Sequence, residues 1–390
     1  MVRADDWRQF RGPDGQGHSD AHGLPTEWGE TRNITWKVPV PGRGWSSPVV
    51  ADGRVWLTTA TQAGREGSLR LLAFDVASGR PVLDVELFRL RNSALLNPKN
   101  SLASPTPIVE GDRVYVHFGA EGTAAVSTTG EVVWKTRIQY ESQHGNGGSP
   151  VLYGDLLIFN CDGFDAAFIL ALDKRTGRTR WRTSRPEPWS QAYSTPLVIR
   201  VDDRDMIVSA GAFHALAYDP HNGREIWRVD YPEGFSNIPR PVYGAGLVFI
   251  ATGFQQPSIL AVRPNGKGDV TKSHIAWTLS RGAPLTPSPL LVGDDLYVVT
   301  DAGIVSNVEA ATGAVRWQHR LGASVSASPV FCDGHIYFLD EEGRTTVIDP
   351  GPVFQQVAVN SLDGGALASI AIASQSFFIR TATHLYRIAK

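Results

Sequence analysis

Short hydrophobic runs separated by turns recur along almost the whole chain. The stretch from Thr286 to Leu321 contains four runs of a few residues, rich in Val, Leu, Ile and Tyr, with Asp, Gly or Thr-Gly at the junctions. Such junctions favour tight turns between antiparallel strands. The predicted strands are Leu290–Val292, Leu296–Thr300, Ile304–Val308 and Val315–Arg320. A four-stranded meander cannot bury both of its faces, so we expect it to pack against copies of itself.

Copies of this unit follow one another at a period of roughly 40–50 residues. A Ser-Pro or Thr-Pro pair precedes the first strand of most units, and Arg240-Pro241 stands at the odd one. The pairs are Ser47-Pro48, Thr106-Pro107, Ser149-Pro150, Thr195-Pro196, Ser288-Pro289 and Ser328-Pro329. A Trp closes most units, at Trp134, Trp181, Trp227, Trp277 and Trp317. Four strands per unit at this period are typical of the blade of a β-propeller.

The last unit, from Ala366 to Lys390, contains only three predicted strands. They are Ser369–Ile372, Phe377–Thr381 and Leu385–Ile388. The segment Ile34–Val40 carries Trp36 as other fourth strands carry their Trp, so we expect it to complete this unit. Pairing the two ends removes open strand edges. The sequence therefore predicts an all-β fold, an eight-bladed β-propeller of four-stranded antiparallel blades.

Residues 1–33 stand outside the repeat and lack its periodicity. We expect them to form an extended N-terminal arm, fixed to the propeller by Trp7, Phe10 and Trp28, with residues 34–390 as a single domain. The 390 residues include 39 Gly and 25 Pro, which fits a chain dense in turns, and 42% hydrophobic residues, which is enough for a large core.

Charge and cysteine content narrow the classes of function. A net charge of −2 argues against a nucleic-acid partner or an anionic membrane surface. No run approaches the ~18 apolar residues of a membrane span. Cys161 and Cys332 lie in the third and seventh predicted blades, so we expect free thiols. No apolar signal core follows Met1, so the chain is expected to be cytoplasmic or to lack an export signal in this sequence.

Three segments resemble the repeat of pyrroloquinoline-quinone (PQQ)-type propellers. Ala171–Trp181, Ala217–Trp227 and Glu309–Trp317 end the third strand, turn at Thr-Gly or Asn-Gly, and place Trp on the fourth strand. The resemblance covers residues 34–390. The opening WRQFRGPDGQG, with SSPVV soon after, resembles the PQQ-like propellers of planctomycetes, which are similar to the family of the outer-membrane assembly lipoprotein BamB. The resemblance implies a periplasmic or secreted location, but a shared fold does not name a function.

The same repeat occurs in quinoprotein alcohol dehydrogenases, so PQQ chemistry has to be weighed. Those enzymes carry adjacent cysteines beside the cofactor, and this sequence has no Cys-Cys pair and no Cys-x-x-Cys-His haem site. The turn Asp173–Gly177 lacks the Glu that closes a calcium loop, and no His-Glu-x-x-His motif indicates zinc. We therefore expect no cofactor and no metal.

The candidate site follows from blade topology. Loops before the first strand and after the second strand of each blade open on the same face, where polar residues that differ between blades should line a funnel. If the protein is an enzyme, the expected catalytic residues are His117, His144, Asp162 and Arg240. The expected ligand-binding residues are Asn97, Lys99, Asn146, Asp165, Tyr193, Asp301, Glu341 and Arg380. Several belong to the long connection of residues 88–104, and long loops on a rigid scaffold often bind ligands.

Three functions remain open. The first is a non-catalytic, monomeric binding or scaffold protein that presents the funnel to a protein or a glycan. The second is a cofactor-independent enzyme, a lyase or hydrolase, that acts on a carbohydrate. His117 or His144 would then act as acid or base, with Asp162 orienting one ring and Arg240 or Lys99 neutralising a substrate carboxylate. The third is a quinoprotein dehydrogenase.

Overall fold

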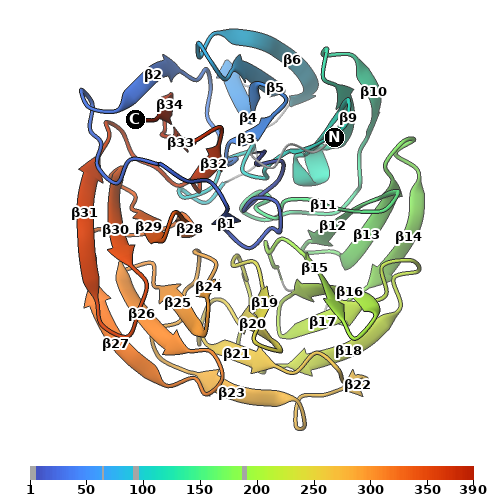
Figure 1. Ribbon diagram of the computed structural model, residues 1–390. Helices are drawn as coiled ribbons and strands as arrows, with labels where there is room; N and C mark the ends of the chain where they lie inside the picture. The colour runs from blue at the N-terminus through green and yellow to red at the C-terminus, as the bar shows by residue number, and fades with distance from the viewer. Residues whose placement is uncertain (1–5, 64–65, 91–95, 187–190) are drawn as a thin grey trace. The chain divides into compact units, whose positions relative to one another are not determined.

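A computed structural model describes residues 6–63, 66–90, 96–186 and 191–390. It contains eight antiparallel meanders of four strands, most of which are labelled in Figure 1, and one three-residue 3-10 helix, η1 (Gly119–Glu121). The all-β fold class and the eight-bladed propeller are thereby confirmed. No described helix has the length and apolarity that crossing a membrane requires. The chain divides into two compact units: residues 1–137, 144–146 and 321–390 form unit 1, and residues 138–143 and 147–320 form unit 2.

Unit 1 contains the first, second, seventh and eighth blades. The first blade is β3 (Val49–Ala51), β4 (Arg54–Ala63), β5 (Glu66–Asp75) and β6 (Pro81–Leu90), and the second is β7 (Ile108–Glu110), β8 (Arg113–His117), β9 (Thr123–Ser127) and β10 (Val132–Thr136). The seventh is β28 (Val330–Cys332), β29 (His335–Leu339), β30 (Arg344–Asp349) and β31 (Gln355–Ser361), and the eighth is β32 (Ala371–Ala373), β33 (Ser376–Arg380), β34 (His384–Ile388) and β2 (Ile34–Pro39).

Unit 2 contains the third to sixth blades. The third is β11 (Val151–Tyr153), β12 (Leu156–Asp162), β13 (Ala167–Asp173) and β14 (Thr179–Ser184), and the fourth is β15 (Leu197–Val201), β16 (Arg204–Ala210), β17 (His214–Tyr218) and β18 (Glu225–Asp230). The fifth is β19 (Val242–Gly244), β20 (Leu247–Ala251), β21 (Ile259–Val262) and β23 (Ile275–Leu279), and the sixth is β24 (Leu290–Val292), β25 (Asp295–Val299), β26 (Ile304–Glu309) and β27 (Val315–Arg320).

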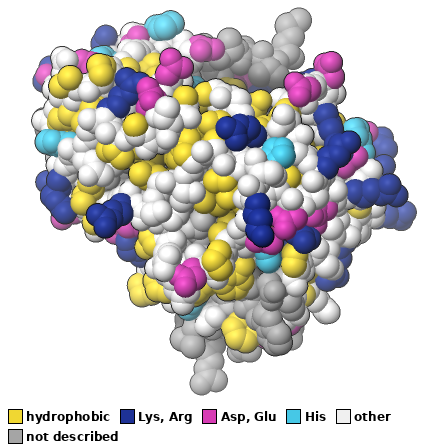
Figure 2. Space-filling view, turned by 90° about the horizontal axis from the view of Figure 1, so that it is seen from below, with side chains coloured by type: hydrophobic (Ala, Val, Ile, Leu, Met, Phe, Trp, Pro, Cys, Tyr) yellow, Lys and Arg dark blue, Asp and Glu magenta, His cyan; other side chains and the backbone are white. Residues whose placement is uncertain are grey.

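The middle strands of each blade form the core. Every residue of β12 and of β13 is buried, because blades pack face to face and cover both sides of these strands. Fourth strands are more exposed, as the pattern of β27 shows. Side chains of opposite charge are interspersed over the surface seen in Figure 2, as expected for a net charge near zero. Cys161 and Cys332 are buried free thiols, as predicted.

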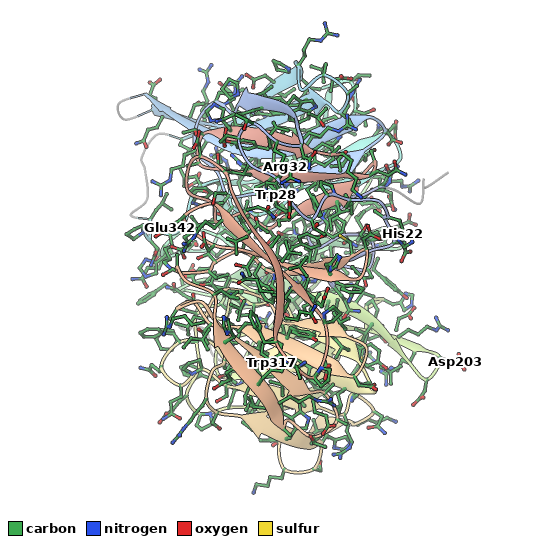
Figure 3. All side chains as sticks on the ribbon, turned by 60° about the vertical axis from the view of Figure 1, so that its left-hand side comes forward. His22, Trp28, Arg32, Asp203, Trp317 and Glu342 are labelled. Atoms are coloured by element: carbon green, nitrogen blue, oxygen red, sulfur yellow. The ribbon has the colours of Figure 1, made fainter. Side chains whose placement is uncertain are left out.

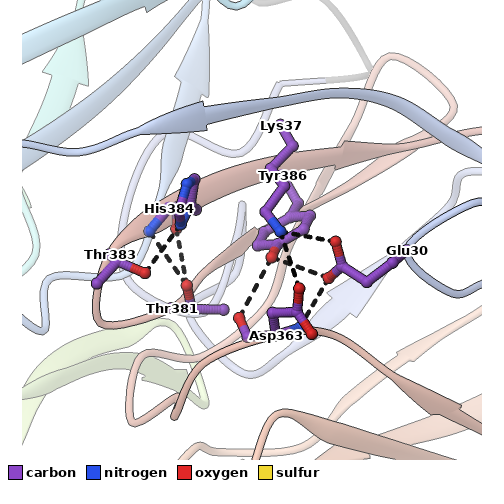
Figure 4. Close-up of polar contacts among 7 residues, drawn as sticks. All are labelled: Glu30, Lys37, Asp363, Thr381, Thr383, His384 and Tyr386. Carbon is purple, nitrogen blue, oxygen red and sulfur yellow. Dashed lines mark hydrogen bonds and ion pairs between the residues drawn. The ribbon is translucent and has the colours of Figure 1, made fainter.

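Strand β2 completes the eighth blade, as the position of Trp36 predicts. It pairs antiparallel with β34, with Trp36 opposite Arg387 and Val38 opposite Leu385, and the two strands lie side by side in Figure 1. A polar cluster fixes this junction: Lys37 Nζ lies 2.7 Å from Glu30 Oε2 and 3.2 Å from Asp363 Oδ2 (Figure 4). The hydroxyl of Tyr386 donates to Glu30 Oε1 at 3.0 Å, so the arm, β2 and β34 share one hydrogen-bond network.

The N-terminal arm forms a short strand of its own, which the lack of periodicity did not predict. Strand β1 (His18–Ser19) pairs parallel with β28 in the seventh blade. The side chains of Trp7 and Trp28 are buried, and Trp7 forms an isolated antiparallel bridge with Val50. A second short strand, β22 (Gly268–Asp269), pairs parallel with β18.

Three Trp residues of the repeat, Trp36, Trp181 and Trp277, contact the following blade. Trp36 Nε1 donates to the carbonyl of Val76 at 2.9 Å, and its ring lies against Gly79 in the following blade: a Cβ at Gly79 would be 2.8 Å from Trp36 Cδ2. The same geometry recurs for Trp181 with Pro220 O and Gly223, and for Trp277 with Ala310 O and Gly313. The Gly of the Thr-Gly or Asn-Gly turn is therefore required both by its left-handed backbone and by the neighbouring indole.

The Ser-Pro and Thr-Pro pairs also connect blades. The N–H of Ser149 donates to Thr195 Oγ1 at 2.9 Å, and the N–H of Ser47 donates to Thr106 Oγ1 at 3.0 Å. The same bond joins Ser328 to Ser369 at 2.9 Å and Ser369 to Ser47 at 3.1 Å. The hydroxyl at this position, which precedes Pro in each of these acceptors except Ser369, accepts the backbone N–H of the equivalent residue in the preceding blade, and this explains why Ser or Thr recurs there.

Candidate functional site

Strand register identifies equivalent positions at the ends of the second strands. In unit 1, β33, β4 and β8 pair with their first strands at Phe378, Trp56 and Tyr115. The residues two positions further along are Arg380, Thr58 and His117, and the seventh blade has Leu339 there. In unit 2, the same register gives Asn160, Ala210, Ala251 and Val299. Polar side chains therefore occupy this position in the eighth, first, second and third blades only.

His117 is one of these strand-end residues in unit 1. Its side chain is completely buried, and Nδ1 lies 2.8 Å from the hydroxyl of Thr123 on the neighbouring strand β9. Burial lowers the pKa of His117 to about 3, so the imidazole is neutral near pH 7. An acid or base must reach its substrate, and burial keeps this ring from the solvent.

Four of the predicted residues gather on one side of unit 1. Lys99 Nζ lies 2.7 Å from Glu341 Oε1, although the two residues are far apart in sequence, and Ser326 also donates to Glu341 at 2.6 Å. The side chain of Asn97 accepts the N–H of Lys99. The carbonyl of His144 accepts a bond from Asn100 Nδ2 at 2.6 Å. His144 adopts a left-handed backbone, and Asn146, two residues further along, is half-buried.

The turn that carries Glu341 and the part of the N-terminal arm around His22 lie on opposite sides of unit 1. Figure 3 shows Glu342, the neighbour of Glu341, at one edge of the view and His22 at the other. Asp333, between β28 and β29, accepts N–H groups of Gly23 and Leu24 in this part of the arm. The turn after the second strand of the seventh blade therefore lies away from the His22 side.

Arg380 ends strand β33 in unit 1. Its side chain is buried, with about 2% exposed. Nη1 donates to Ser46 Oγ at 2.8 Å, to Thr58 O at 2.9 Å and to Ser46 O at 3.3 Å. These bonds attach the end of the eighth blade to the start of the first. Burial lowers the pKa of Arg380 to about 9.

Asp162 pairs with Arg185 in unit 2, where the sequence analysis expected it to orient a histidine. Asp162 Oδ1 lies 2.8 Å from Arg185 Nε, and both side chains are buried. Arg185 Nη2 also donates to Ser209 Oγ at 2.7 Å, and Ser209 donates to Asn160 Oδ1 at 2.9 Å. Burial raises the pKa of Asp162 to about 6, and Arg185 opposes that rise. The network joins the third blade to the fourth.

The other predicted residues of unit 2 have local partners. Tyr193 donates to the carbonyl of Gln143 at 2.8 Å, and burial raises the pKa of its hydroxyl. Asp165 accepts the N–H of Glu141 at 2.7 Å, and Asp301 accepts the N–H of Leu285 at 2.7 Å. Arg240 is buried, and its backbone N–H donates to Ser288 Oγ at 2.9 Å.

Exposed aromatic residues are the feature that the sequence analysis missed. Phe164 follows β12 and is 56% exposed, and Phe254 follows β20 and is 53% exposed. The Phe254 ring lies 5.5 Å from that of Phe235, which lies 6.2 Å from Phe213, so three rings from the fourth and fifth blades form one cluster in unit 2. A signal was present in the sequence, because each exposed ring directly follows a Gly in the loop after a second strand. Arg185 was also missed, since its partner is set by tertiary structure alone.

The class of protein is an eight-bladed β-propeller with variable polar and aromatic loops after its second strands. A family model described as outer membrane protein assembly factor BamB matches residues 23–163, 70–213, 165–264 and 212–352. The chain belongs to this family of PQQ-like propellers. No match was found among curated protein sequences.

Two solved structures show the same fold. BamB from Moraxella catarrhalis is similar over 91% of this chain and 99% of its own, with 13% identity and a TM-score of 0.64. A europium-containing methanol dehydrogenase is similar over 98% of this chain and 91% of its own, with 10% identity and a TM-score of 0.65. At this identity the likeness concerns the fold.

The dehydrogenase raises the question whether the described residues suit a bound quinone and metal. Among them, no three or more His, Cys, Asp or Glu side chains are grouped to hold a metal ion. The chain's two cysteines lie in different blades, so no adjacent pair could pack against a quinone ring. The described donor set does not fit these groups, and we derive no step through them.

Proposed function

We propose that this protein is a non-catalytic binding protein of the bacterial envelope or the extracellular space. Its ligand is a protein or a glycan that docks on the loops after the second strands. The observation that carries the proposal is the exposure of Phe164 and Phe254 after second strands. Of the four predicted catalytic residues, His117, Asp162 and Arg240 are buried and His144 is half-buried.

Exposed aromatic rings support a binding role because they bury a large area at little cost in conformational entropy. Aromatic residues are enriched at the centres of protein interfaces, and a few of them carry most of the binding free energy. The backbone N–H of Phe254 donates to the carbonyl of Phe235 at 2.7 Å, so the ring cluster of Phe213, Phe235 and Phe254 has a rigid base. The family's description as an outer-membrane assembly factor favours a protein ligand in the envelope.

The test uses the double variant F164A/F254A. Wild-type protein is screened against envelope proteins and against a glycan array, and each ligand found is titrated with both proteins. Loss of the two rings should weaken binding by about tenfold or more, as for other aromatic hot spots. The control is V353A, which removes a side chain that is 74% exposed in a turn of unit 1.

Two results would contradict the proposal. One is equal binding by the wild type and F164A/F254A while V353A also binds normally. The other is turnover of a bound carbohydrate. The second result would favour the enzyme, and H144A should then lower the rate by roughly 10²–10⁴-fold without changing the melting temperature.

A further inference from the structure

Arg380 is a buried cation with no carboxylate partner among the described residues. Its three hydrogen bonds all start from Nη1 and all end on neutral oxygens of Ser46 and Thr58. Arg185, the comparable buried arginine of unit 2, has Asp162 at 2.8 Å. A buried charge is costly unless it is paired, because the interior cannot replace its hydration. Arg380 therefore remains able to pair with an anion, whereas Arg185 is already paired with Asp162.

The unused donors of Arg380 lie on one edge of the guanidinium. With Nη1 occupied, Nε and Nη2 donate to no acceptor in the part of the chain that the structure describes. These two nitrogens form the side-on edge of arginine, where two parallel N–H groups match the two oxygens of a carboxylate. Lysine offers no such pair.

A glycine brings bare backbone close to this edge. A Cβ at Gly44 would be 2.7 Å from Arg380 Nη2 and 2.8 Å from the carbonyl of Thr58, so a side chain at residue 44 would collide with the guanidinium. Gly44 has no positive φ that would itself require glycine. Close approach to the backbone of Thr58 and to Arg380 is therefore the reason for glycine here.

The same loop carries a second arginine with neutral partners. Arg43 Nη2 donates to the carbonyls of Pro98 at 2.9 Å and Asn100 at 3.4 Å. Arg43 and Gly42 also line a cavity of about 240 Å³ in unit 1, and its described lining contains no Asp or Glu. The loop at residues 42–46 thus carries Arg43 and contacts Arg380 through Gly44 and Ser46, and neither arginine has a carboxylate partner among the described residues.

We propose that Arg380 binds a carboxylate group of the ligand through its Nε and Nη2 edge, with Arg43 adding positive potential from the same loop. The proposal deepens the binding role proposed above, because it assigns the ligand a carboxylate. In the free protein, Nη1 holds the guanidinium in place against Ser46 and Thr58, so its side-on edge is oriented before the ligand arrives. Such preorganisation lowers the entropic cost of binding.

The experiment follows the Nε–H resonance of Arg380 by ¹H–¹⁵N NMR in the full chain. The resonance is assigned by its loss in R380K, and acetate is the probe, with acetamide as the neutral analogue of the same shape. Acetate should shift the Nε–H resonance in a saturable way and raise the melting temperature, and acetamide should do neither. Galacturonate and galactose then repeat the comparison for a sugar that does or does not carry a carboxylate.

Two variants distinguish acetate binding at Arg380 from a general effect of salt. R380K keeps the charge but loses the paired donors, so acetate affinity should fall at least tenfold. R387K is the control: Arg387 lies on the next strand, and its Nη1 and Nε also donate to neutral oxygens, of Val76 and Ser376. It should leave acetate binding unchanged.

The proposal is wrong if acetate leaves the Nε–H resonance unshifted, if acetamide shifts it equally, or if R380K stabilises with acetate as the wild type does. Should R380K not fold, the melting temperature of the wild type with acetate and with acetamide still decides. The outcome is independent of the binding role, because F164A/F254A tests side chains of unit 2. Acetate binding can fail while those rings still bind a partner.

Discussion

The guanidinium of Arg185 lies 2.8 Å from the carboxylate of Asp162, and neither side chain has contact with solvent beyond a few per cent of its surface. A Cβ at Gly211 of the fourth blade would be 2.7 Å from Arg185 Nη1, so the next blade closes over the pair. Removing one partner of such a pair leaves a buried charge, which typically costs about 3–5 kcal/mol. The pair therefore makes the stability of unit 2 sensitive to pH.

Titration of Asp162 should be visible in the pH dependence of stability. Its pKa is raised to about 6 in the folded chain, so the folded state binds the proton more tightly than the unfolded state does. The resulting stabilisation is full below about pH 4 and is lost as the pH rises to 6, by about 1.4 kcal/mol per pH unit. Urea unfolding of the wild type and D162N across pH 4–7 measures this slope, which should be absent in D162N. A wild-type advantage that grows with pH in this range would contradict the prediction.

The contribution of His117 to stability should depend on pH with the opposite sign. Its pKa is lowered to about 3 by burial, so its contribution is full above about pH 6.5 and is lost as the pH falls towards 3. Relative to H117Q, the wild type should lose about 1.4 kcal/mol per pH unit over this range. The control is H22Q, which removes an imidazole that is 82% exposed. Equal acid sensitivity of H117Q and the wild type would show that His117 does not titrate as a buried group.

The contact between Gly79 and Trp36 should make G79A more harmful than an ordinary glycine replacement. Gly53 has the same left-handed backbone, with φ +77° against +71° at Gly79, but a Cβ at Gly53 would meet nothing within 4 Å. G53A therefore measures the backbone cost alone. G79A should cost about 1–3 kcal/mol more, the usual range for overpacking. Urea unfolding checks this, and equal losses would mean that the indole moves aside freely.

The hydrogen bond from Ser149 to Thr195 gives a test of the connection between blades. T195V keeps the shape of the side chain but leaves the buried N–H of Ser149 without its acceptor, which typically costs about 1–3 kcal/mol. T195S keeps the hydroxyl and is the matched control. Hydrogen exchange at Ser149 should accelerate in T195V and stay near the wild-type rate in T195S. Similar exchange in both variants would show that the bond contributes little.

The fold was predictable because each blade repeats the same local signals. The Trp of the fourth strand and the turn Gly recur in sequence since they touch in space, and Trp36 shows the same signal ahead of the first blade. Strands β1 and β22 were not predictable: each has two residues, too few for a periodic pattern, and each pairs with a strand far away in sequence.

The site was harder to predict than the fold. His117 and Arg380 are polar residues at strand ends, which suggested an open rim, yet the register places both among buried side chains. Partner choice is also invisible in a single sequence. Asp162 pairs with Arg185 and Lys99 pairs with Glu341 because the folded chain brings those segments together, and no sequence motif joins residues so far apart.

The pairing of β2 with β34 has a consequence for the newborn protein. Residues Ile34–Pro39 leave the ribosome early, but their partner His384–Ile388 is made roughly 350 residues later, a delay of about 20–70 s at ordinary rates of translation. Throughout that time the β2 segment has no partner strand, and its sequence can pair with β34 of another molecule. On a crowded messenger, the strand of one nascent chain can enter the eighth blade of a finished neighbour. Expression at high density should therefore produce strand-exchanged dimers, which dilution alone does not quickly dissolve.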